Sequence, residues 1–226
     1  MKDSPATPVP AASVLLMRPA TVGIEVLYLR RNPALAFRGG YWVFPGGRVE
    51  PEDCPPGARR DGEAAARGAA VREAREEAGV RLSTASLTSG VHWTTLPDSP
   101  VRFATWYFVA RAPTGRIRVD GGEIQAYRWL RPNDALARFR AGEIRLAEQT
   151  FGLTVRMAGF ADVAAALTAV AAWPKERLVG ELRDVEGGRV AIYGQDAACG
   201  DGPLDRSGPR HRLWMVAPEW RYERDL

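Results

Sequence analysis

Residues 72–80 read Arg72-Glu73-Ala74-Arg75-Glu76-Glu77-Ala78-Gly79-Val80, and this stretch decides the fold. If the stretch is helical, its three carboxylates fall at i, i+3 and i+4, which is one face of the helix. Like charges at this spacing repel each other, so the face is unfavourable unless a cation binds to it. Carboxylate oxygens suit a divalent cation. The stretch therefore predicts a helix that binds a metal ion.

A glycine turn, Phe44-Pro45-Gly46-Gly47, precedes this helix. Pro45 stops the short strand-like segment before it, and two glycines allow backbone amides and carbonyls to approach a ligand closely. Taken alone, a run of Glu and Arg on a helix is more often a solvated face with ion pairs. The glycine turn and Gly79, placed as a left-handed helix cap, favour a metal-dependent site for a phosphate-containing ligand.

The remaining pattern predicts an α/β protein with a β-rich tail. Strands are expected at 12–17, 24–31, 41–44, 90–95, 102–111 and 123–130, and in the tail at 178–182, 189–193 and 212–216. Helices are expected from Glu63 to the Gly79 cap, with Asp61 as N-cap, and over 132–140 and 155–171. Gly68 inside the first helix indicates close backbone packing. Residues 1–11 are expected to be a disordered leader, and 51–62 an exposed, mobile insertion.

The bulk composition is that of a soluble globular protein, with 46% hydrophobic and 26% charged residues among 226. The net charge is 31 − 27 = +4 and the arginines are scattered, which does not support a nucleic-acid-binding patch. Cys54 and Cys199 are too few for a disulfide framework or a thiolate metal site. We find no secretory signal and no apolar stretch of the roughly 20 residues that span a bilayer. We therefore expect a cytoplasmic protein without nucleic-acid or membrane partners.

Gly47 together with residues 72–80 resembles the signature of the Nudix hydrolase superfamily. That signature runs Gly, five residues, Glu, seven residues, then Arg-Glu-aliphatic-x-Glu-Glu-x-Gly-aliphatic. The second half matches, with Ala74 in the aliphatic position. The first half departs: Gly47 and Arg72 are 72 − 47 = 25 positions apart where the family has 14, an excess of 11. Asp53 lies six after Gly47, where the first Glu is expected, and Glu63 is the alternative.

The interrupted signature is similar to a Nudix branch that includes peroxisomal coenzyme A diphosphatases. Flanking segments at 30–37, 40–47, 127–132 and 142–146 also resemble that branch. The resemblance implies a Nudix-type α/β/α sandwich with a mixed sheet. We expect a Nudix domain over 12–172 and a β-rich extension over 173–226 packed on the same domain.

The resemblance also implies a set of site residues. Glu73, Glu76 and Glu77 would bind Mg²⁺ or Mn²⁺, and Arg72 would brace these carboxylates. The general base varies in this superfamily, so the catalytic candidates are Glu76, Glu77, Arg72 and the distant acid Glu123. The substrate-binding candidates are Gly46, Gly47, Arg38 and Phe37, and a carbonyl of Gly46 or Gly47 would complete the metal shell.

The implied activity is hydrolysis of the diphosphate link in a nucleoside diphosphate derivative, with coenzyme A or acyl-coenzyme A as first candidate. ADP-ribose, NADH and dinucleoside polyphosphates are the alternatives within the enzyme class. The alternative of another class is a non-catalytic Nudix domain that binds a nucleotide. The intact acidic cluster argues against it, because a binding domain has no need of a self-repelling face. A homodimer is an open expectation, since Nudix proteins often dimerise.

Overall fold

The first long strand, β1 (Val9–Pro19), alternates its side chains between two hydrophobic cores. Ala12, Val14 and Leu16 pack in the core beneath α1 (Glu63–Ala78). Leu15 and Met17 face the opposite core. This period-two alternation places one helical layer on each side of the strand. The computed structural model, which describes residues 6–225, thus confirms the expected α/β/α sandwich.

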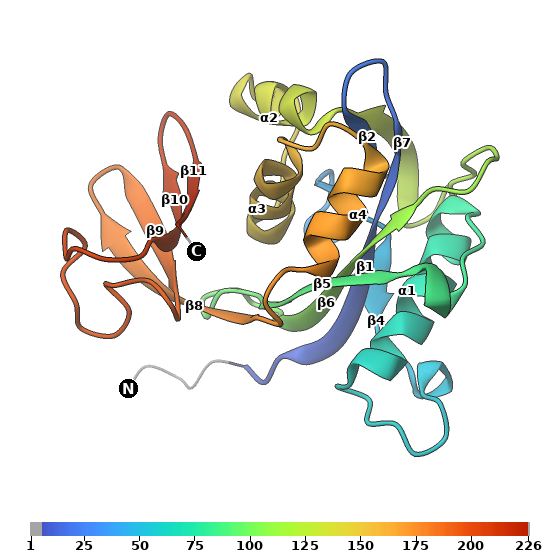
Figure 1. The fold of residues 1–226 in the computed structure, drawn as a ribbon, viewed down its shortest axis with the longest axis horizontal. Helices are drawn as coiled ribbons and strands as arrows, with labels where there is room; N and C mark the ends of the chain where they lie inside the picture. The colour runs from blue at the N-terminus through green and yellow to red at the C-terminus, as the bar shows by residue number, and fades with distance from the viewer. Residues whose placement is uncertain (1–5, 226) are drawn as a thin grey trace.

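The second face carries three helices, which lie across the strands from α1 in Figure 1. They are α2 (Pro132–Arg140), α3 (Glu148–Met157) and α4 (Val163–Ala171). The single helix expected over 155–171 is therefore wrong. The chain turns at 158–161, and Asp162 caps α4 by accepting a hydrogen bond from the Ala165 N–H at 2.8 Å.

The sheet is mixed and continuous through the tail. In order of pairing, its strands are β11 (Arg221–Arg224), β10 (His211–Val216), β9 (Gly188–Tyr193), β8 (Arg177–Val185), β5 (Thr88–Thr94), β6 (Phe103–Arg111), β1, β2 (Ile24–Arg31) and β3 (Trp42–Val43). In addition, β4 (Gly46–Arg48) pairs with β1, and β7 (Ile124–Leu130) pairs with β2. The β1–β6 and β5–β8 pairs are parallel, and the others are antiparallel.

The tail joins the main sheet through β8, which runs beside β5. Trp93 of β5 packs against Tyr193 at 5.3 Å between ring centroids and against Tyr222 at 6.0 Å. These aromatic contacts bury one side of the tail against the domain. None of the helices within residues 6–225 has the length and apolar character needed to cross a bilayer.

Residues at the start of the chain extend the sheet further than expected. Val9, Pro10 and Ala11 pair with β6, so the expected leader over 1–11 is wrong for these three residues. Its first five residues lie outside the described part of the chain. The tertiary partner is β6, nearly a hundred residues away, and it overrides the Pro-rich local sequence.

The ends of α1 show one correct and one incorrect cap. Gly79 has φ +68° and donates its N–H to the Ala74 and Arg75 carbonyls, as the sequence predicts. The N-cap is Gly62 and not Asp61. The Asp61 carboxylate instead accepts two hydrogen bonds from Arg59, at 2.9 and 2.8 Å, so it is not available to the helix N-terminus.

The insertion between β4 and α1 packs against the helix at Gly68. It contains a short 3₁₀ helix, η1 (Pro51–Asp53). A second one, η2 (Thr84–Ser86), follows α1. A Cβ at Gly68 would lie 2.5 Å from the Asp53 carbonyl oxygen. Asp53 is buried, so the insertion is not exposed throughout as expected.

We predict that Gly68→Ala lowers the free energy of unfolding by about 1–2 kcal/mol, because the clash outweighs the better helix propensity of Ala. Urea denaturation of the wild type and the variant measures the change. Gly159→Ala is the matched control, since its Cβ would enter open space. A more stable Gly68→Ala variant would show that the insertion does not pack on α1 as described.

Candidate active site

Three acids of α1 occupy different environments on the side of the helix nearest β4. The Glu77 residue is only 4% exposed. The Glu73 side chain is 14% exposed and the Glu76 side chain is 57% exposed. Two of the three expected metal ligands are therefore largely withdrawn from water, and one faces solvent.

The glycine turn meets these acids, as the sequence analysis expected. The Gly46 N–H donates a hydrogen bond to Glu77 Oε2 at 2.9 Å. A Cβ at Gly47 would lie 2.2 Å from Glu73 Oε1, so this position has no room for a side chain. The β1 register produces this approach, because Ser13 pairs with Gly46 and Ala12 with Gly47. Their roles in binding a ligand or metal remain predictions.

Burial changes the acidity of the two inner carboxyls. Burial is the main cause that raises the pKa of Glu77 to about 8, and repulsion from Glu73 and Glu123 adds to it. The Gly46 N–H and Arg31 oppose this shift. Burial also raises the pKa of Glu73, despite the opposing effect of Arg72. The positive charge near these two carboxyls is therefore too small to offset their burial and their mutual repulsion.

Arg72 connects this face with the insertion. Its Nε and Nη2 donate to Asp53 Oδ1 and Oδ2, both at 3.0 Å, and its Nη1 donates to Glu73 and Glu76, both at 2.9 Å. The expected bracing by Arg72 is therefore present in the geometry. A guanidinium carries five N–H donors in a planar fork, so this one side chain can donate hydrogen bonds to three carboxylates at once.

The structure chooses between the two candidates for the first acid of the signature. Asp53 accepts the bidentate contact from Arg72, and its side chain is 4% exposed. Glu63 instead pairs with Arg67 at 2.8 Å, toward Ser89 of β5. The insertion therefore places Asp53, and not Glu63, in contact with Arg72.

The donor chemistry of this face fits a divalent cation. As the side chains stand, no group of three or more His, Cys, Asp or Glu within residues 6–225 is arranged to hold an ion. Glu73 and Glu76 share Arg72 in this arrangement. However, a buried carboxyl whose pKa lies near 8 gains most from a neighbouring cation, and hard oxygen donors are what Mg²⁺ and Mn²⁺ prefer. Glu73, Glu76 and Glu77 are the residues that would hold it.

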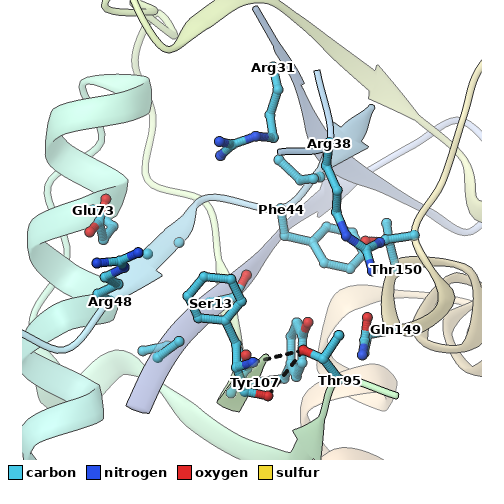
Figure 2. A pocket seen from close by; sticks show the side chains of 18 of the residues that line it. Ser13, Arg31, Arg38, Phe44, Arg48, Glu73, Thr95, Tyr107, Gln149 and Thr150 are labelled. Carbon is cyan, nitrogen blue, oxygen red and sulfur yellow. Dashed lines mark hydrogen bonds between the residues drawn. The ribbon is translucent and has the colours of Figure 1, made fainter. Parts of the chain in front are cut away.

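A cavity of about 450 Å³ opens beside this face. Figure 2 shows Glu73 and Arg48 on the α1 side, Arg31 at the top of the view and Arg38 on the side away from α1. Phe37, Gly46, Gly47 and Glu123 also line it, so all the predicted substrate-binding residues border one space. Glu123 pairs with Arg31 at 2.6 Å. The cavity therefore combines carboxylates at one end with arginines that suit phosphate groups.

Several lining residues were not identified from the sequence. They include Arg31 and Arg48, and the polar side chains of Ser13, Tyr107, Gln149 and Thr150. Arg48 directly follows the glycine turn, which was a usable signal, and Arg31 is the last residue of β2, in a segment already quoted for its resemblance. The other four are separated from the motif by long stretches of chain and carry no local pattern.

We predict that Glu77→Gln removes a pH dependence of stability. Between pH 4.5 and about 8, the unfolded chain releases a proton that folded Glu77 retains, so folded stability falls as pH rises. In EDTA at pH 8, the variant should be more stable than the wild type by about 1–3 kcal/mol, and the difference should vanish near pH 4.5. Denaturant titrations across this range test the sign. Parallel profiles would contradict the burial of a protonated Glu77, and Glu186→Gln, an exposed change, is the control.

We predict that Arg72→Lys costs about 1–3 kcal/mol of stability, because a single ammonium cannot serve Asp53, Glu73 and Glu76 together. Thermal and urea unfolding provide the measurement. Arg75→Lys, an exposed change on the same helix, should have no effect. Equal stability of the two variants would show that the Arg72 contacts contribute little.

Comparisons with known proteins identify the family and agree with the fold. The NUDIX domain family model matches residues 7–149. A NUDIX hydrolase from Alicyclobacillus acidocaldarius superposes with a TM-score of 0.66 at 24% identity, covering 75% of this chain and 99% of that one. The NUDIX domain of Shewanella oneidensis NrtR, complexed with ADP ribose, superposes with a TM-score of 0.51 at 16% identity, covering 67% and 88%.

A search of curated proteins by sequence gave no match. The match to the family model spans more than half of the chain, from residue 7, just before β1, to the first turn of α3. It includes the glycine turn, Asp53 and the acidic face of α1. The chain belongs to the Nudix family of pyrophosphohydrolases.

Proposed function

We propose that the protein hydrolyses the diphosphate link of a nucleoside diphosphate derivative with Mg²⁺ or Mn²⁺. The single observation that supports this proposal is the cavity beside α1. It is lined by Glu73 and Glu123 together with Arg31, Arg38 and Arg48, and Glu77 lies behind this lining, bonded to the Gly46 amide. Breaking a diphosphate needs charge neutralisation and a positioned water, and these residues supply the first requirement.

The reaction forms one phosphorus–oxygen bond and breaks another. A water oxygen attacks one phosphorus, the bridging oxygen leaves with the other phosphate, and the water proton passes to a base. A bound Mg²⁺ or Mn²⁺ would polarise phosphate oxygens and lower the pKa of a bound water. Arg31 and Arg48 bind and orient the phosphates, and Arg38, paired with Glu148, borders the path of the substrate. Glu123, Glu76 and Glu77 are the base candidates, and Glu123 borders the cavity next to Arg31.

Coenzyme A or acyl-coenzyme A is the first substrate candidate, giving adenosine 3′,5′-bisphosphate and a phosphopantetheine product. The support for it is the interrupted signature at 47–72 and its flanking segments. ADP-ribose, NADH and dinucleoside polyphosphates remain alternatives, and the NrtR domain was solved with ADP ribose. The cavity is within the 300–1,000 Å³ that small-molecule sites generally occupy.

A binding domain without activity is the contrasting proposal. Burial, with added repulsion from Glu73 and Glu123, raises the pKa of Glu77 to about 8, so an ionised Glu77 is unfavourable at this position without a nearby cation. Such an arrangement is unfavourable in a domain that never binds a cation, which supports the catalytic proposal. We also expect a cytoplasmic enzyme without nucleic-acid or membrane partners.

The test is a screen of purified protein with Mg²⁺ or Mn²⁺ against coenzyme A, ADP-ribose, NADH and dinucleoside polyphosphates, with product masses recorded. Glu77→Gln should reduce kcat by more than about 100-fold while the protein stays folded. Glu186→Gln, exposed in the tail, should keep full activity. Turnover unaffected by Glu77→Gln would contradict the metal assignment, and no turnover of any substrate would favour a binding domain.

A further inference from the structure

The end of the cavity farthest from α1 is lined by polar side chains that the proposed hydrolysis does not use. Figure 2 shows Glu73 on one side and Gln149 and Thr150, from the first turn of α3, on the other. Thr95 and Tyr107 lie at the same end. The nearby charges of Arg38 and Glu148 neutralise each other in an ion pair of 2.6 Å. This end therefore suits an uncharged polar group better than a phosphate.

Gln149 is the residue at this end whose hydrogen-bonding groups are available to a ligand. It is 6% exposed and lines the cavity, yet its side-chain amide makes no hydrogen bond to another residue within 6–225. A primary amide offers two donors and an acceptor oxygen. Leaving such a group unpaired in the interior is costly, so native structures pair it with protein, water or ligand. The amide atoms are open to the cavity, so their partner there is water or a ligand that displaces it.

Two further features shape this end of the cavity. No side chain caps α3 at Ala147, so N–H groups of its first turn are left unsatisfied beside Gln149. An aromatic pair leads from this end toward Arg48: the Phe37 ring lies 5.4 Å from the Arg38 guanidinium and 5.8 Å from the Phe103 ring, which lies 5.9 Å from the Arg48 guanidinium. A flat ring with both donors and acceptors on its edge satisfies the amide and the aromatic pair together.

The loop that carries Phe37 is held in an unusual conformation. Arg38 has φ +53°, the one positive φ outside glycine among residues 6–225. Its guanidinium pairs with Glu148, the neighbour of Gln149, and lies over the Phe37 ring at 5.4 Å. Backbone strain of this kind persists where the surrounding structure fixes it, and it clusters at ligand sites. The loop and the first turn of α3 are thus locked to each other at this end.

We infer that Gln149 reads the edge of the substrate's nucleobase, which stacks near Phe37 and Phe103. This inference rests on the proposed function, because it assigns one end of the same cavity. The Gln149 oxygen accepts from the exocyclic amine of adenine, and its nitrogen donates to a ring nitrogen. The diphosphate then extends past Arg38 toward the carboxylates of α1. Gln149 is a specificity-determining residue, with no part in bond breaking.

Gln149→Glu tests the inference, because a carboxylate accepts hydrogen bonds but does not donate them. The change removes the bond to the adenine ring nitrogen and favours the two adjacent donors of guanine. Isothermal titration calorimetry in Mg²⁺ would compare α,β-methylene-ADP with α,β-methylene-GDP. The ratio of the two affinities should move toward guanine by about tenfold or more. In Gln149→Leu, both ligands should weaken and the two affinities should converge.

The matched control is Gln195→Glu, the same change at an exposed position in the tail, which should leave both affinities unchanged. If Gln149→Glu does not fold, as thermal unfolding would show, Gln149→Leu decides the matter alone. Affinities within twofold of wild type for both ligands in the folded variants would overturn the inference. Turnover of the wild type is measured separately. A shifted base preference without turnover would refute only the proposed hydrolysis, and turnover with an unshifted preference would refute only the role of Gln149.

Discussion

Burial of the Glu77 carboxylate against the Gly46 amide is the constraint on which the site depends. It brings an acid of α1 into contact with the backbone of β4, and it is possible only because β4 pairs with β1 beneath the helix. The absence of a side chain at Gly47 lets Glu73 approach the same strand. The β1 alternation thus has a functional consequence, since the core that seats α1 also sets the distance between its acids and the glycine turn.

This arrangement places more carboxyl groups than positive charges on the inner side of α1. Glu73 and Glu77 are buried close to Glu123, and Arg72 offsets part of their charge from one side. Arg72 also binds Asp53, so the insertion contributes the acid that orients the arginine. An insertion of 11 residues is tolerated here because added length in a surface loop costs little entropy, whereas the Asp53 contact is retained. The remaining deficit of positive charge is what a divalent cation would supply.

The regular elements were largely predictable, and their errors have local causes. The helix from Glu63, its Gly79 cap and the α2 boundaries matched because periodicity and caps agree there. The helix over 155–171 was wrong because an Ala-rich run hid the Gly159 turn and the Asp162 cap. Asp61 has a good capping side chain, but Arg59 binds it. Residues 9–11 lacked any local strand signal beyond Val9, and their pairing depends on β6.

The sequence by itself determined that Glu73, Glu76 and Glu77 share one side of a helix that ends at Gly79, because their spacing and the glycine cap are local patterns with a direct physical meaning. Only the tertiary structure decided that Asp53, and not Glu63, meets Arg72, and that Arg31, Arg48 and Gln149 border the same cavity. The physical reason is that side-chain neighbours across a sheet follow from strand register and helix packing. These connect residues a hundred positions apart, which no periodicity within one segment encodes.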